Sequence, residues 1–199
     1  MSHPASDECL NVIFNQARTY TAWLPKPVED ELLRKVYDVA KMGPTSANTC
    51  PMRVVFVKSP AAKERLKPAL MPGNVDKTMA APVCAIIATD TRFYELMPEL
   101  FPRQPDFGKM FTLPGKEEFT RVHAMRNGSL QGGYLIIAAR ALGLDCGPMS
   151  GFDNAKVDAE FFPDGRWKSN FLVNLGYGDP SKLYPRNPRL DFEEACRVV

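Results

Sequence analysis

Three short apolar runs, separated by stretches with helical periodicity, constrain the fold of this chain more than any other feature. They are Val54–Val57, Val83–Ala88 and Asn170–Leu175. Each run is rich in β-branched or other apolar residues and is bounded by turn-forming sequence, which is typical of an interior strand. Strands interleaved with helices predict an α/β or α+β layer around a central sheet.

Helical periodicity fills the intervals between these runs. It predicts helices at Ser6–Ala17, Val28–Met42, Pro60–Leu70, Asn74–Ala80, Glu117–Leu142 and Asp153–Phe161, with a short last helix in the tail Pro185–Val199. The longest helix ends at Gly143. Its expected buried stripe consists of Leu130, Tyr134, Ile137, Ala138 and Ala141.

A proline-rich segment, Pro98–Pro114, interrupts the regular pattern. We expect an irregular, lid-like insertion at about residues 98–116, because prolines exclude long regular elements. Phe107 and Phe111 lie within it; capping of a ligand site is one role open to them, and core packing is the expected one. A chain of 199 residues has room for one domain, here residues 1–199.

Charge and hydropathy narrow the possible partners. The chain carries 25 Lys and Arg against 23 Asp and Glu, a net charge of +2, so no basic surface indicates nucleic acid. The longest apolar runs are too short to span a bilayer. The N-terminus lacks the basic start and apolar stretch of a signal peptide. We therefore expect a cytoplasmic protein without nucleic-acid or membrane partners.

The sequence contains few residues suited to binding a metal or to acid–base catalysis without a cofactor. The five cysteines are widely spaced without a C-x-x-C pair, and the two histidines are His3 and His123. Neither a disulfide framework nor a metal site is expected. His123 lies in the longest helix, where an ordinary surface histidine is the expectation. No dinucleotide fingerprint, phosphate loop, nucleophile elbow or zincin motif is present. An enzyme of this composition would depend on a cofactor.

Small polar and cationic residues recur in four separated segments. They are Arg18 and Thr19, Ser46 and Asn48, Asn74 and Lys77, and Arg186 and Arg189. Arginine forks bind phosphate, and amides or hydroxyls donate to ring carbonyls and nitrogens. Taken singly, each arginine could be a solvated surface charge, and Ser46 and Asn48 could simply form a turn. Their joint arrangement indicates a phosphorylated, heterocyclic ligand.

Five segments together resemble the FMN-dependent nitroreductase family across almost the whole chain. They are Leu10–Trp23, Met42–Asn48, Gly73–Lys77, Gly147–Phe152 and Asn174–Gly178. Within that family, Gly43–Asn48, Arg140–Asp153 and Leu172–Leu183 are most similar to the HadB/RutE branch, the malonic semialdehyde reductases of pyrimidine degradation.

The resemblance implies an α+β fold with a central mixed sheet flanked by helices, in an intertwined homodimer with two FMN sites across the interface. By that resemblance, Arg18 and Thr19 match a phosphate-binding motif, and Ser46 and Asn48 match a loop that approaches the flavin from the partner. Asn74 and Lys77 match the pair at the flavin's polar edge. The segment that lies along the ring near N5 in the family is matched by Pro148, Met149, Ser150 and Gly151. Arg189, and more loosely Arg186, match C-terminal phosphate ligands.

Two departures from the family pattern concern the ligand contacts. Many relatives begin with Arg-Arg-Ser-x-Arg, whereas this chain has Ala17-Arg18-Thr19-Tyr20-Thr21, with two fewer arginines. Phosphate binding would then depend more on the C-terminal arginines. Ser150 stands where nitroreductases often have Glu, which bears on nicotinamide preference.

The implied activity is transfer of hydride from NADH or NADPH, through FMN, to a small electrophile. The expected acceptor is malonic semialdehyde, reduced to 3-hydroxypropionate. A broad nitroaromatic or quinone reductase is the alternative within the same class, and a flavin-binding module without turnover is an alternative of another class. No catalytic side chain is identified, because the flavin carries the chemistry.

Overall fold

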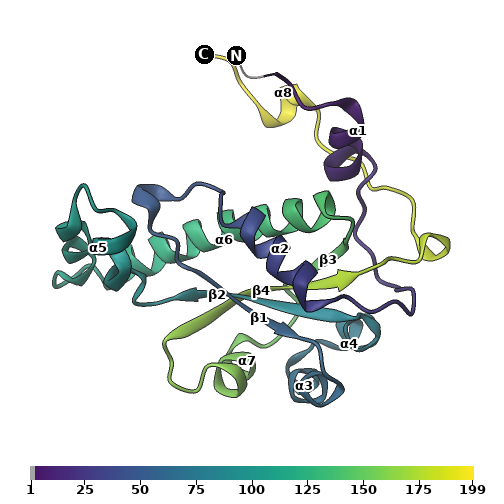
Figure 1. Ribbon diagram of the computed structural model, residues 1–199, viewed down its shortest axis with the longest axis horizontal. Helices are drawn as coiled ribbons and strands as arrows, with labels where there is room; N and C mark the ends of the chain where they lie inside the picture. The colour runs from purple at the N-terminus through teal and green to yellow at the C-terminus, as the bar shows by residue number, and fades with distance from the viewer. Residues whose placement is uncertain (1–2) are drawn as a thin grey trace.

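A four-stranded sheet carries helices on both of its faces in the computed structural model, which describes residues 3–199 (Figure 1). The strands are β1 Met52–Val57, β2 Val83–Asp90, β3 Asp145–Met149 and β4 Trp167–Gly176, in the order β1-β2-β4-β3. The three apolar runs are confirmed as β1, β2 and β4, and the α+β class is confirmed with them.

The sheet differs in two respects from the expected one. All three ladders between its named strands are antiparallel rather than mixed, and the one parallel contact within residues 3–199 is the isolated bridge between Thr19 and Cys146. β3 was not predicted, because Gly147 and Pro148 interrupt its apolar pattern. Pro148 is tolerated because β3 is an edge strand of the sheet.

Alternate residues of β2 enter two cores. Val83, Ala85 and Ile87 face the helices above the sheet in Figure 1, and Cys84 and Ile86 face those below. This alternation is the two-residue period of a strand. All eight residues of β2 are buried, so β2 is the central support of both layers.

Two helices cover the upper face of the sheet, α2 Asp30–Ala40 and α6 Glu117–Ala141, and three cover the lower face, α3 Pro60–Leu66, α4 Pro72–Ala80 and α7 Asn154–Phe161. The predicted cap of α7 is confirmed, since the Asp153 side chain accepts from the Lys156 amide. The first predicted helix is shorter than expected: α1 spans Asp7–Leu10 and continues as a π-helical turn, Asn11–Asn15. The short last helix is α8, Phe192–Ala195.

The proline-rich segment folds as short helical pieces at one end of the sheet. It contains α5, Met97–Leu100, and a run of 3-10 turns over Pro105–Thr112. Phe111 is buried with Phe93, and Phe107 packs against them, which confirms core packing for both predicted phenylalanines.

The buried face of α6 is not the predicted stripe. Its buried residues include Gly128, Gln131, Gly132 and Leu135, whereas the side chain of Leu130 is exposed. Of the predicted stripe, only Ala138 is fully buried. The prediction followed the apolar residues alone, whereas the buried face also includes glycines and the polar residue Gln131.

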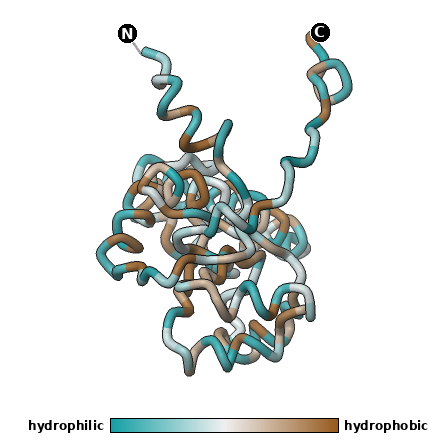
Figure 2. The backbone as a smooth tube through the Cα atoms, turned by 90° about the vertical axis from the view of Figure 1, so that its right-hand side faces the viewer, coloured by the Kyte–Doolittle hydropathy of each residue, from teal (hydrophilic) through white to brown (hydrophobic). Residues whose placement is uncertain are grey.

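Both chain ends extend beyond the body of the molecule. In Figure 2 the N-terminal segment and the C-terminal segment project from the same end and diverge. Tyr184, Leu190 and Phe192 of the C-terminal segment are exposed. Within residues 3–199, no helix combines the length and apolar character needed to cross a membrane.

Two adjacent glycines of α6 give a sharp test of this packing. A Cβ on Gly132 would lie 2.5 Å from Cζ of Phe171, whereas a Cβ on Gly133 would meet nothing within 4 Å. Gly133→Ala should stabilise the protein by about 1 kcal/mol through helix propensity. Gly132→Ala should be less stable than Gly133→Ala by about 1–3 kcal/mol because of overpacking. Urea unfolding measures both, and equal stabilities would contradict this packing.

Candidate functional site

The segment that follows the first helix runs beside β3. Thr19 forms its bridge with Cys146, and the Tyr20 amide donates to the Cys146 carbonyl at 3.1 Å. The Trp23 indole nitrogen then donates to the Lys77 carbonyl of α4 at 2.9 Å. The N-terminal segment, β3 and α4 therefore meet at one edge of the sheet, which we call the β3 edge.

The α4 residues contact the loop that follows β3. Asn74 Nδ2 donates to the Gly151 carbonyl at 2.6 Å. A Cβ on Gly151 would lie 2.4 Å from that amide nitrogen, so only glycine lets Asn74 approach this closely. Within residues 3–199 the half-buried Lys77 ammonium has no hydrogen bond or ion pair. Lys77 is thus an available cation on α4, one helical turn from Asn74.

Pro148 and Met149 end β3, and both are half-buried. Ser150 follows as an exposed residue. The structure therefore brings together Asn74 and Gly151 directly, and it places Thr19, Lys77 and the end of β3 around them.

The three predicted arginines have separate partners. Arg18 donates to the Tyr184 carbonyl, and Arg186 donates to the carbonyls of Asn15 and Ala17, both at 2.8 Å. Arg18 and Arg186 thus lie where the two ends of the chain cross. Arg189 donates to the carbonyls of its neighbours Asn187 and Pro188 at 3.0 Å and is exposed. Within a single chain, no hydrogen bond connects Arg189 to the α4 residues in the described part of the structure.

Ser46 and Asn48 lie elsewhere, in the loop before β1 at the opposite edge of the sheet. The Ser46 amide donates to Asn127 Oδ1 of α6 at 2.8 Å, and Asn48 Nδ2 donates to the Leu100 carbonyl of α5 at 2.8 Å. One chain therefore does not bring these two residues to the β3 edge.

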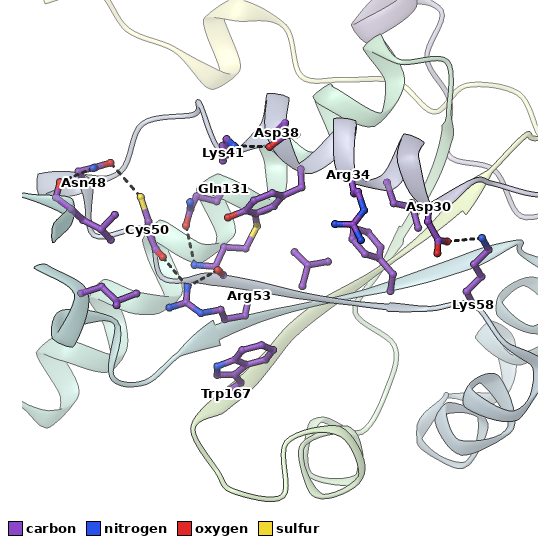
Figure 3. A pocket seen from close by; sticks show the side chains of 17 residues that line it. Asp30, Arg34, Asp38, Lys41, Asn48, Cys50, Arg53, Lys58, Gln131 and Trp167 are labelled. Atoms are coloured by element: carbon purple, nitrogen blue, oxygen red, sulfur yellow. Dashed lines mark hydrogen bonds and ion pairs between the residues drawn. The ribbon is translucent and has the colours of Figure 1, made fainter.

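A groove of about 1110 Å³ runs between α2 and the outer edge of β1 (Figure 3). Asn48 lines it, together with Cys50 and Arg53 from the start of β1 and Asp30 and Lys58 at the other end. No other residue of the predicted site lines this groove. It is thus a second concave feature, distinct from the β3 edge.

The environment of His123 differs from the one that the sequence predicts. Its ring stacks on Phe93 with a centroid distance of 5.4 Å, and Nε2 lies 3.2 Å from the Thr49 hydroxyl. The prediction of a surface histidine is therefore wrong. Burial, with a smaller contribution from the charge of Arg126, lowers the pKa of His123. The five cysteines are free, and burial raises the pKa of Cys84 and Cys146 to about 12.

The donors at the β3 edge match a ligand that combines anionic and polar groups. Lys77 and Arg18 supply positive charge, and the Asn74 amide and the Ser150 hydroxyl supply neutral donors. Within residues 3–199, no group of three or more His, Cys, Asp or Glu side chains is placed to hold a metal ion. The chemistry of this donor set fits a phosphorylated heterocycle such as FMN.

The fold is that of a known class of structure. A crystal structure described as a "putative nitroreductase in complex with FMN", from Exiguobacterium sibiricum 255-15, superposes with a TM-score of 0.85, covers 100% of both chains and is 16% identical in sequence. The chain belongs to the nitroreductase family, whose family model, described as "Nitroreductase family", matches residues 15–177.

Two relatives are more similar in sequence than this crystal structure. A protein from Rhodopseudomonas palustris (strain TIE-1), called "Putative NADH dehydrogenase/NAD(P)H nitroreductase", is 58% identical over 199 residues and covers 100% of both chains. A protein of Ralstonia pickettii with the same name, followed by HadB, is 54% identical over 190 residues, which is 96% of this chain and 97% of the relative. The predicted resemblance to the nitroreductase family is confirmed.

The lowered pKa of His123 predicts a pH-dependent stability. Because the folded pKa lies below the unfolded value of about 6.5, stability is complete above pH 6.5 and falls as the pH drops through the folded pKa. The free energy of unfolding of His123→Gln should therefore fall less between pH 7.5 and pH 5 than that of the wild type.

Urea titrations at several pH values measure this difference. His3→Gln is the matched control, because His3 is exposed and lies outside the aromatic cluster around His123. Parallel pH profiles for the wild type and His123→Gln would show that the imidazole is not held in its neutral form.

Proposed function

We propose that this protein is an FMN-dependent NAD(P)H oxidoreductase that reduces malonic semialdehyde to 3-hydroxypropionate in the cytoplasm. The observation that carries the proposal is the β3 edge, where Asn74 and Lys77 of α4 lie beside the Pro148–Gly151 loop and the Arg18–Thr19 segment. The name of the HadB relative, "Putative NADH dehydrogenase/NAD(P)H nitroreductase", supports an NAD(P)H-dependent reductase, and the FMN-bound neighbour supports the cofactor.

A homodimer completes the site in this proposal. Ser46 and Asn48 lie at the opposite edge from the other predicted ligands, so a second chain must supply them if all of these residues are to meet one flavin. Exposed apolar side chains on the helices agree with such an interface: Val39 is 48% exposed, Met42 78% and Leu130 45%. The unpaired outer edge of β1 and the projecting chain ends are further surfaces that association would cover.

FMN, when bound, supplies the hydride-transfer chemistry between the nicotinamide and the acceptor. The role of the residues of the chain is to bind and orient the FMN. Lys77 and the amide of Asn74 would bind the polar edge of the ring, where a nearby cation would favour negative charge. Arg18, Thr19 and the C-terminal Arg186 and Arg189 would hold the phosphate, and Met149 and Ser150 would contact the ring. The segment at about residues 98–116 acts as the lid.

The overall reaction converts the aldehyde, NAD(P)H and one proton into the alcohol and NAD(P)⁺. Hydride adds to the carbonyl carbon, and the proton is taken up by the carbonyl oxygen. A nitroaromatic or quinone reductase is the second candidate, because the names of both relatives include NAD(P)H nitroreductase.

The first test of function is the purified protein itself. We expect it to be yellow, to release FMN on denaturation, and to oxidise NADH or NADPH when malonic semialdehyde is added. The acceptor with the highest kcat/KM among malonic semialdehyde, a nitroaromatic and a quinone decides between the two reductases. A yellow protein whose absorbance does not bleach on rapid mixing with NAD(P)H would be a flavin-binding module, and a colourless one would refute the proposal.

The second test concerns the phosphate. Arg18→Ala should raise the Kd for FMN by at least about tenfold, since charge-assisted hydrogen bonds to phosphate are strong and each 1.4 kcal/mol is a factor of ten. Arg121→Ala is the matched control, because Arg121 is an exposed arginine of α6 paired with Glu118. Fluorescence titration of both variants measures the Kd, and equal values would remove Arg18 from the phosphate site.

A further inference from the structure

Three polar residues on one face of α6 contact the segment that leads into β1. They are His123, Asn127 and Gln131, spaced four residues apart, so their side chains lie in a row along the helix. Asn127 and Gln131 are each 4% exposed, and the function proposed above uses none of the three. Buried polar residues need hydrogen-bond partners, and each of the three has a partner in this one segment of the chain.

Each member of this polar row contacts a different point of that segment. Asn127 Oδ1 accepts from the Ser46 amide at 2.8 Å, and His123 Nε2 lies 3.2 Å from the hydroxyl of Thr49. Gln131 Oε1 accepts from the Met52 amide at 2.9 Å, at the start of β1 (Figure 3). Asn127 is fixed in turn, because its Nδ2 donates to the His123 carbonyl at 2.9 Å.

The segment held in this way has an unfavourable backbone conformation. Ala47, Asn48 and Cys50 have φ values of 49°, 53° and 39°, in the left-handed region that disfavours residues with a Cβ. Such residues persist only where the surrounding structure determines them, and they cluster at ligand-binding sites. Ser46 and Asn48 are nevertheless exposed, and Asn48 is held by its bond to the Leu100 carbonyl.

We infer that the polar row of α6 is a template that holds the loop Ser46–Asn48 in its ligand-binding shape, with Asn127 as its principal positioning residue. This inference rests on the proposed function, in which the loop meets the flavin of the partner chain. Asn127 does not touch the ligand. It acts through the Ser46 amide, so its loss allows the loop to relax while the rest of the FMN site is unchanged.

The test compares three variants of the flavin-loaded protein. Asn127→Leu has the same number and branching of side-chain heavy atoms but no acceptor, and Asn127→Asp keeps an acceptor for the Ser46 amide. Leu135→Ala removes a fully buried residue of the same helix face that contributes to the core instead. The release of FMN after dilution, followed by flavin fluorescence, should be at least about tenfold faster for Asn127→Leu. It should stay within about threefold of the wild type for Asn127→Asp and Leu135→Ala.

Hydrogen exchange of the amides of residues 46–50 provides a readout that does not depend on flavin release. It should accelerate in Asn127→Leu but not in Leu135→Ala, although both variants have a lowered Tm. Equal FMN release from Asn127→Leu and Leu135→Ala, or unchanged exchange in the loop, would overturn the template. A wild-type protein that binds no FMN would instead refute the proposed function, and exchange would still report whether Asn127 holds the loop.

Discussion

The close approach of α6 to the sheet determines much of the remaining structure. Gly128 and Gly132 lie directly over Thr89 and Phe171, where a Cβ would come within 2.3 Å and 2.5 Å of those side chains. Because α6 lies this close to the sheet, only small residues fit between them along part of the helix. Further towards its N-terminus the same face carries Asn127, so the close packing also sets where the loop before β1 must run.

Much of the fold could be predicted because its strands have strong local signals. β1, β2 and β4 are runs of apolar residues, and α2 ends at Ala40, shortly before the predicted stop at Gly43 and Pro44. The signal failed for β3, whose Gly147 and Pro148 are poor strand formers that an edge strand tolerates. It failed also for the buried face of α6. That helix has apolar residues on two sides, and periodicity alone cannot say which side meets the sheet.

The candidate site was predictable in its residue types but not in its contacts. The spacing of Asn74 and Lys77 on one helix is readable in the sequence, and so is the spacing of Asn127 and Gln131. The left-handed conformations of Ala47 and Cys50 are not, because no glycine marks them. The bonds of Arg186 to main-chain carbonyls near the other end of the chain depend on tertiary structure, which local patterns do not encode.

The hydrogen bonds of Arg186 have a practical consequence for shortening this protein. Arg186 fastens the C-terminal segment to the main chain at Asn15 and Ala17, and Arg18 fastens the N-terminal segment back to Tyr184. The two ends thus form a mutual clasp rather than two independent tails. Deleting residues 187–199 leaves this clasp closed, because Arg186 and Tyr184 both remain, whereas cutting before Tyr184 opens it. The choice of truncation point near the carboxyl end therefore decides how the amino end is anchored.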